Sequence, residues 1–352
     1  MRIAKIYNNS IIDYYVTSCK TKRKKQHEKY TYLPEEYKYI DNETGEALTF
    51  EEKERRCKEE NATQRITEDN RTNGKISNKA KARMKKAVKK FVEAYTVGVY
   101  GKKWEIFRKK LLINFVTLTL PARQKHSDYQ IKKIALNAFL QKLKNEYSVT
   151  AYIWRAEKQE NKNIHFHILI NRNIKHKIIR CEWNKIINRL GYVNDYKEKM
   201  QKLSLNEYIK MRKPKTNEEV KKCILAYNKG KREGWENPNS TDIHKIEKIK
   251  NLSAYITKYI TKDEKKEGLG VEGHFWGKSE NLEDTKEYET ELTKKDKIKI
   301  VRLIEENKVK EIKRDYVTYY SFVNCSILDF NFSFLDEYLE QCKQNYKQLE
   351  YY

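Results

Sequence analysis

The clearest hydrophobic pattern in the chain is the alternation in residues 164–170, where His165 and His167 flank Phe166. This stretch is rich in β-branched and aromatic residues, which is typical of a strand. Because side chains alternate between the two faces of a strand, both imidazoles lie on one face, and Phe166 and Ile168 lie on the other. Two histidines placed in this way favour a metal site on the surface of a sheet.

A second strand precedes this one and completes a hairpin. Residues 151–158 again combine β-branched and aromatic side chains, and the polar residues 159–163 are typical of a turn. If Trp154 packs on the apolar side of the hairpin, then Arg155 and Glu157 stand on the face of the histidines. Two histidines and one carboxylate with open coordination positions suit Mg²⁺ or Mn²⁺ acting on a phosphate. No Cys-x-x-Cys pair accompanies them, so a structural zinc site is not predicted.

Helices are predicted between the other strands, because apolar residues recur three and four positions apart. The expected helices cover Ser77–Tyr95, Ser127–Tyr147, Arg180–Leu190 and residues 199–235. The other expected strands cover residues 113–120, Tyr192–Tyr196 and Asp242–Ile246, with a candidate near Ile11–Val16. This order predicts an α+β fold, in which helices back a central antiparallel sheet.

The charge of the chain indicates a polyanionic partner. Lys and Arg number 75 against 50 Asp and Glu, which gives a formal net charge of +25. One face of the predicted helix 77–95 is lysine-rich, and DNA contacts are expected from Lys85, Lys86, Lys89 and Lys90 and from Arg155 on the histidine face. A merely solvated helix surface is the alternative. The 26 tyrosines favour single-stranded nucleic acid, whose bases stack on aromatic rings.

Binding to a membrane is the competing explanation of a strongly basic chain, and the sequence argues against it. No apolar run approaches the roughly 18 residues of a membrane span, and no signal peptide is recognisable. The six cysteines are scattered without paired spacing, which predicts a reduced, cytoplasmic protein.

A candidate nucleophile lies in residues 251–262, where a Tyr-x-x-Lys unit occurs twice in tandem. On a helix, positions four apart share a face, so Tyr255 and Tyr259 project side by side, with Lys258 and Lys262 one turn further on. Core packing is the common explanation of tyrosines at this spacing. A phenol with a pKa near ~10 is a weak nucleophile at neutral pH, and the lysines and the metal site could activate it.

Three elements occur in one order: the strand at residues 115–119, then Glu157 with the histidine pair, then the two Tyr-x-x-Lys units. This order resembles the HUH endonucleases, the initiators of rolling-circle replication. It is most similar to the replication-associated proteins of microviruses and of their relatives integrated in Bacteroidetes. The resemblance covers about residues 75–282 and includes segments 154–161, 237–244 and 275–277.

The resemblance implies a sheet-based palm in which His165 and His167 bind a divalent metal and Tyr255 or Tyr259 cuts DNA. The expected enzyme nicks single-stranded origin DNA, leaves a 5′-phosphotyrosine and a free 3′-OH that primes rolling-circle replication, and religates the strand. Residues 98–102 are too short to form a P-loop, so a host helicase and polymerase in the bacterial cytoplasm are the expected partners.

Four regions follow from the composition and the resemblance. They are a polar, charged N-terminal extension at 1–75, the HUH endonuclease domain at 76–262, a linker or flap at 263–296, and a small helical and aromatic cap at 297–352.

Other functional classes remain open at this point. A relaxase or a single-strand transposase shares the chemistry and differs in substrate. A non-catalytic nucleic-acid-binding protein explains the charge but leaves the paired histidines and tyrosines as coincidence. A metal-dependent phosphodiesterase that uses water needs the histidines but not the tyrosines. Asp242 and His244 are expected near the same sheet, either in the metal shell or in a structural role.

Overall fold

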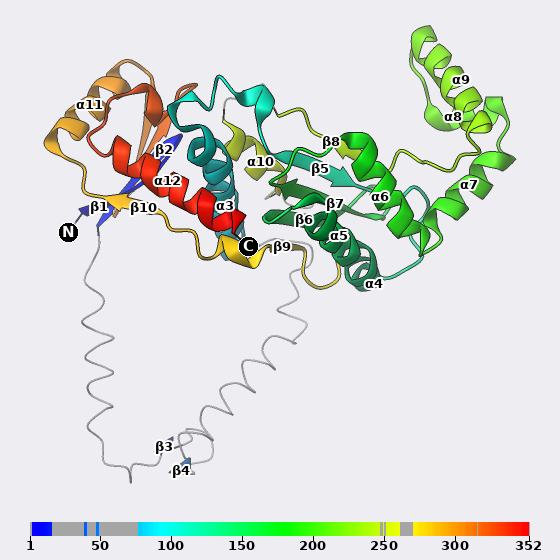
Figure 1. Ribbon diagram of the computed structural model, residues 1–352, viewed down its shortest axis with the longest axis horizontal. Coiled ribbons are helices and arrows are strands. Elements are labelled where there is room, and N and C mark those ends of the chain that lie inside the picture. Colours follow the sequence, from blue (N-terminus) through cyan, green and yellow to red (C-terminus); the bar gives the residue numbers. More distant parts are fainter. Residues whose placement is uncertain are drawn as a thin grey trace.

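The computed structural model describes residues 2–15, 39–40, 47–48, 77–246, 249, 251–260, 270–314 and 316–351. In these residues the chain forms two five-stranded antiparallel sheets with helices packed against them (Figure 1). A short ribbon also pairs β3 (Tyr39–Ile40) with β4 (Ala47–Leu48). The α+β class predicted from the sequence is confirmed.

The sheet that carries the histidine pair, here called the central sheet, has the strand order β8-β5-β7-β6-β9. Its strands are β5 (Asn114–Leu118), β6 (Tyr152–Lys158), β7 (Ile164–Ile170), β8 (Thr241–Ile243) and β9 (Trp276–Lys278). The strands predicted at 113–120, 151–158, 164–170 and after Asp242 are therefore present. The edge strand β9 lies within residues 263–296, where only a linker or flap was expected.

One face of the central sheet packs against two helical segments. The first runs without a break through α4 (Asp128–Gln130), the π-helical η5 (Ile131–Leu136) and α5 (Asn137–Tyr147). The second is α6 (His176–Asn188). Phe166, Phe139 and Trp183 are buried between these layers. The helix begins at Ser127, whose side chain accepts the Gln130 amide in a capping box, as a short polar residue before an apolar repeat predicts.

The histidine face packs against α3 (Asn78–Glu93) and α10 (Leu252–Ile260). Ser77 caps α3 through the amide of Ala80, at the position expected from the sequence. Val88 from α3, Ile256 from α10 and Phe115 from β5 belong to one buried cluster. Helix α10, with both candidate tyrosines, is therefore held directly over the histidine face.

The second sheet joins the two ends of the described chain, in the order β10-β1-β2-β12-β11. Its strands are β1 (Arg2–Tyr7), β2 (Ser10–Tyr15), β10 (Tyr288–Thr290), β11 (Val309–Arg314) and β12 (Val317–Phe322). Helices α11 (Lys294–Glu305) and α12 (Leu335–Glu350) contribute to its core. The C-terminal region is thus not purely helical, as expected, but shares a sheet with the N-terminal strands.

Three helices form an arm that projects from the body of the molecule (Figure 1). They are α7 (Tyr192–Lys202), α8 (Leu205–Arg212) and α9 (Asn217–Arg232). The helical and basic character predicted for 199–235 is confirmed, but the strand predicted at Tyr192–Tyr196 is wrong. Gly191 has a φ of +80°, which turns the chain between α6 and α7, and Tyr192 and Val193 then pack inward as the first turn of a helix.

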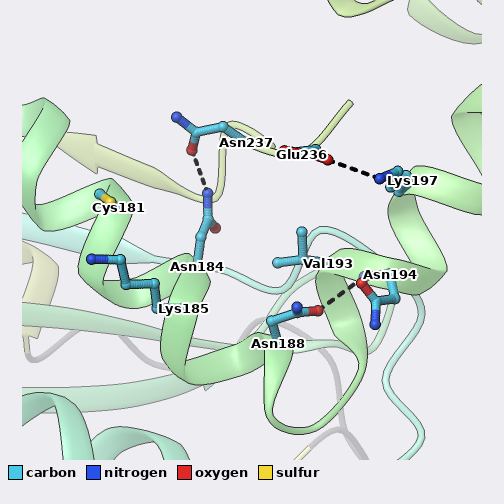
Figure 2. Close-up of a pocket in the computed structure, with 9 residues that line it drawn as sticks. All are labelled: Cys181, Asn184, Lys185, Asn188, Val193, Asn194, Lys197, Glu236 and Asn237. Atoms are coloured by element: carbon cyan, nitrogen blue, oxygen red, sulfur yellow. Dashed lines mark hydrogen bonds and ion pairs between the residues drawn. The ribbon is translucent and has the colours of Figure 1, made fainter. Parts of the chain in front are cut away.

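A hydrogen-bonded loop fixes the entry to β8 (Figure 2). Asn184 on α6 donates to Asn237 Oδ1 at 2.7 Å and to the Pro238 carbonyl at 3.0 Å. These bonds form one wall of a cavity of about 370 Å³ between α6 and α7. The loop is thereby anchored so that β8 pairs with β5, which places Asp242 opposite Thr117.

In the part of the chain that the structure describes, no helix is both long enough and apolar enough to cross a bilayer.

Candidate metal and nucleophile site

Three side chains converge on the histidine face of the central sheet. Glu157 on β6 lies opposite His165 on β7, and the alternation of β7 places His167 on the same face. His165 Nε2 lies 2.6 Å from Glu157 Oε1, His167 Nε2 lies 3.0 Å from the same oxygen, and the two Nε2 atoms are 3.2 Å apart. The structure therefore brings together the three residues that the sequence predicts as metal ligands, and they could hold a metal ion.

The spacing of these donors fits a small divalent cation. Ligands about 2.1 Å from an octahedral ion lie about 3 Å from their neighbours, which is close to the separations seen here. A carboxylate favours Mg²⁺ or Mn²⁺, and imidazole also accepts other transition metals. The donor set thus suits the predicted ions without selecting one of them.

The electrostatics of the site keep its donors in the forms that bind metal. Burial alone would raise the pKa of Glu157, but hydrogen bonds from His165 and His167 hold it well below its usual range. Burial also lowers the pKa of His167, which favours the neutral imidazole. A charged carboxylate and a neutral imidazole are the ligand forms that a cation requires.

A hydroxyl behind the site orients His167. Thr117 Oγ1 lies 3.0 Å from His167 Nδ1 and 2.8 Å from His244 Nε2. With Nδ1 occupied by this contact, Nε2 of His167 faces the other donors. The sequence analysis left His244 undecided and assigned no role to Thr117. The alternation Phe115-Val116-Thr117 could have revealed it, since this strand pairs Thr117 with His167.

The two tyrosines of α10 lie at different distances from the donors. The Tyr259 ring packs against the rings of His167 and His244, with centroid separations of 6.1 and 5.3 Å. The Tyr255 ring lies 4.9 Å from that of Tyr259, and its hydroxyl is 3.5 Å from the Tyr259 hydroxyl. Tyr259 is therefore the tyrosine beside the donor set, and Tyr255 lies behind it.

The environment of Tyr255 disfavours its ionised form. Burial, together with the neighbouring Tyr259 hydroxyl, raises the pKa of Tyr255 to about 12. Lys258 is exposed and, because successive helix positions differ by about 100°, it projects from a different flank of α10 than Tyr259. Lys262 lies outside the described residues.

Arg155 occupies a position that differs from the expectation. Only 1% of it is exposed, so its burial does not support the predicted contact with DNA. Its Nη1 donates to the carbonyls of Tyr259 at 3.2 Å and Ile260 at 2.9 Å, and its Nη2 lies 3.6 Å from Glu157 Oε2. The guanidinium thus links a candidate metal ligand to the last turn of the tyrosine helix.

The lysines of α3 predicted to contact DNA are Lys85, Lys86, Lys89 and Lys90. Three of them contact other parts of the protein. Lys86 pairs with Glu287 at 2.7 Å, Lys89 reaches Ser10 Oγ at 3.3 Å, and Lys90 donates to the carbonyl of Thr285. Lys85 is exposed. Of these four lysines, Lys85 is the one best placed to meet a phosphate at the surface.

The site lies within a segment that is similar to known replication proteins. Residues 113–264 match the family model of the replication-associated protein ORF2. The match covers less than half of the chain and runs from β5 past the end of α10, so it includes the three donors and both tyrosines. It supports a replication initiator. No curated protein and no solved structure matches the chain.

Proposed function

We propose that the protein nicks single-stranded origin DNA by attack of Tyr259 on a phosphodiester held beside Glu157, His165 and His167. This is the chemistry of an HUH-type initiator of rolling-circle replication, with Mg²⁺ or Mn²⁺ as the cofactor. A host helicase and polymerase in the bacterial cytoplasm would then extend the free 3′-OH.

The packing of Tyr259 on His167 is the observation that best supports this proposal. The phenol and the donor set come from elements almost a hundred residues apart, and α10 holds them against the same face of the sheet. A water-using phosphodiesterase would not require a tyrosine at this place. The +25 charge agrees with a polyanionic substrate.

The donor set fits a divalent ion in charge, spacing and protonation. When bound, such an ion would polarise the scissile phosphate and offset the negative charge that develops during attack. The Thr117 hydroxyl keeps His167 oriented toward this centre, and Arg155 holds Glu157 near the turn of α10 that carries Tyr259.

In the proposed step, the Tyr259 oxygen forms a bond to phosphorus, and the bond between phosphorus and the 3′ oxygen breaks. The phenolic proton passes to solvent, and the departing oxygen takes up a proton to become the 3′-OH. Because the phosphodiester is exchanged for a phosphotyrosine, the reverse reaction rejoins DNA without a nucleotide cofactor.

We assign Tyr255 to a second attack that would release the covalent bond after one round of replication. Its hydroxyl is close enough to that of Tyr259 to follow it, at 3.5 Å. Its raised pKa makes it the weaker nucleophile for the first attack. Lys258 and Lys262 are proposed to offset phosphate or phenolate charge around this helix.

A covalent-adduct assay tests the proposal. The protein is incubated with Mn²⁺ and single-stranded fragments that tile the DNA flanking its gene, and adducts are separated on a denaturing gel. We expect one fragment to form an adduct that EDTA and the variant His167→Ala abolish, whereas the exposed control His274→Ala retains it. Absence of an adduct with every fragment would contradict the proposal, and cleavage without an adduct would favour the water-using phosphodiesterase.

A further inference from the structure

A groove separates the tyrosine helix from the second sheet. It has a volume of about 520 Å³ and is lined by residues of α3, α10, β2 and β12. This volume lies within the range of roughly 300–1,000 Å³ that is typical of ligand sites. Asn251, Ala254 and Lys258 of α10 form one wall, so the groove adjoins the helix that carries Tyr255 and Tyr259.

Three lysines supply positive charge to this groove: Lys85 and Lys89 from α3 and Lys258 from α10. Lys85 and Lys258 are exposed. Lys89 is largely buried, and within the described residues its ammonium contacts a hydroxyl and a ring, Ser10 Oγ at 3.3 Å and the centroid of Tyr7 at 4.0 Å. A cation held by neutral groups keeps its charge available to an incoming anion.

Aromatic rings line the opposite wall. Tyr319 on β12 pairs with Ile12 on β2, and it is 38% exposed on the outer face of the second sheet. Tyr7 lies on the same face, because it pairs with Ser10, two positions before Ile12. A sheet face that offers tyrosines beside lysines is the arrangement by which many proteins bind single strands, with bases on rings and phosphates on cations.

We infer that this groove binds the nucleotides that flank the cleavage site of a single-stranded DNA. A base stacks on Tyr319, and neighbouring phosphates contact Lys85, Lys89 and Lys258. This inference rests on the proposed function for its substrate, and it adds a role for the second sheet, which lies largely outside the segment that matches the replication family.

The chemistry of the groove favours this occupant over a peptide. Among the described residues that line it, the one carboxylate, Glu93, is engaged at the inner wall by the amide of Asn8 at 2.8 Å. The remaining charged side chains of this lining are the three lysines, so the groove repels basic segments and attracts a polyanion.

Binding of a fluorescein-labelled oligothymidylate, measured by fluorescence anisotropy without metal, tests the inference. Base stacking tolerates any sequence, so this probe does not require the origin to be known. Tyr319→Ala should weaken binding about tenfold, Tyr319→Phe should restore it, and Lys85→Ala should weaken it several-fold. The matched controls are Tyr316→Ala on the β11–β12 turn, 68% exposed, and Lys294→Ala at the exposed start of α11.

The outcomes separate this inference from the proposed function. If Tyr319→Ala and Lys85→Ala bind the probe as tightly as the controls while the wild type forms a covalent adduct, the groove inference fails and the nickase remains. If both variants lose affinity but no adduct forms with any DNA, the groove inference stands and the nickase fails. Failure of the wild type to bind the probe, or tighter binding of an RNA of the same length, would also overturn the assignment to DNA.

Discussion

Replacing Arg155 tests whether the metal ligands and the tyrosine helix form one mechanical unit. Its Nη1 donates to two carbonyls in the last turn of α10, at 3.2 and 2.9 Å, and its Nη2 approaches Glu157. The change Arg155→Met keeps much of the volume but leaves these carbonyls without their charged donor. A hydrogen bond to a charged group contributes about 1.5–3 kcal/mol, so the loss of two should cost about 3–5 kcal/mol of unfolding free energy.

This loss should be visible in thermal unfolding and in activity. In a chain of this size it corresponds to a fall of about 10 °C in Tm, measured by differential scanning fluorimetry. Arg155→Lys should be intermediate, since an ammonium keeps the charge but cannot span both carbonyls and Glu157. Adduct formation at a temperature where the variant is folded should fall more than oligothymidylate binding, because α10 loses its anchor next to Tyr259.

The control is Arg232→Met on α9, where the arginine is exposed and distant from the site. An Arg155→Met protein that unfolds within about 2 °C of the wild type would refute the reasoning, because a fully buried guanidinium would then contribute no more than a surface one.

Three further predictions concern metal, salt and pH. Mn²⁺ at a hundred times its Kd should stabilise the protein by about 2.7 kcal/mol in the same assay; His167→Ala should remove the effect and Glu157→Ala only part of it, and equal shifts in all three proteins would contradict the site. Lys85→Ala should reduce the slope of log affinity against log salt by about 1, whereas Lys86→Ala should not, because Lys86 pairs with Glu287; equal slopes would place Lys85 in solvent. Burial would raise the pKa of Glu287, but its basic and tyrosyl partners hold it at about 2, so its stabilisation is complete above about pH 4.5 and is lost as the pH falls toward 2. Glu287→Gln should therefore flatten acid unfolding by on the order of 2 kcal/mol in urea titrations, and an unchanged acid limb would contradict this.

The donors and the tyrosines could be predicted because local periodicity determines them. Alternation along a strand puts His165 and His167 on one face, and the helical repeat puts Tyr255 and Tyr259 on one side. The facing position of Glu157 also follows from the parity of the hairpin. None of these inferences depends on residues far away in the chain.

The second sheet could not be predicted, because its pairing is not local. Tyr320 pairs with Ile11 across more than three hundred residues, and nothing in either strand specifies the other. The same reason applies to Arg155 and Lys86, whose partners lie on α10 and next to β10. The short segment at Tyr192 failed for a different reason, since a few apolar residues fit a strand and a helical turn equally well.

The central claim is that Tyr259 makes the first covalent bond to DNA, and mass spectrometry of the trapped adduct tests it most directly. Trypsin cleaves after Lys250, Lys258 and Lys262, so the two tyrosines fall in different peptides, 251–258 and 259–262. After nuclease trimming, we expect the 5′-phosphonucleotide on peptide 259–262 in the wild type and in Tyr255→Phe, and no adduct in Tyr259→Phe during the first turnover. A nucleotide found only on peptide 251–258, or DNA cleavage that leaves both peptides unmodified, would contradict the account.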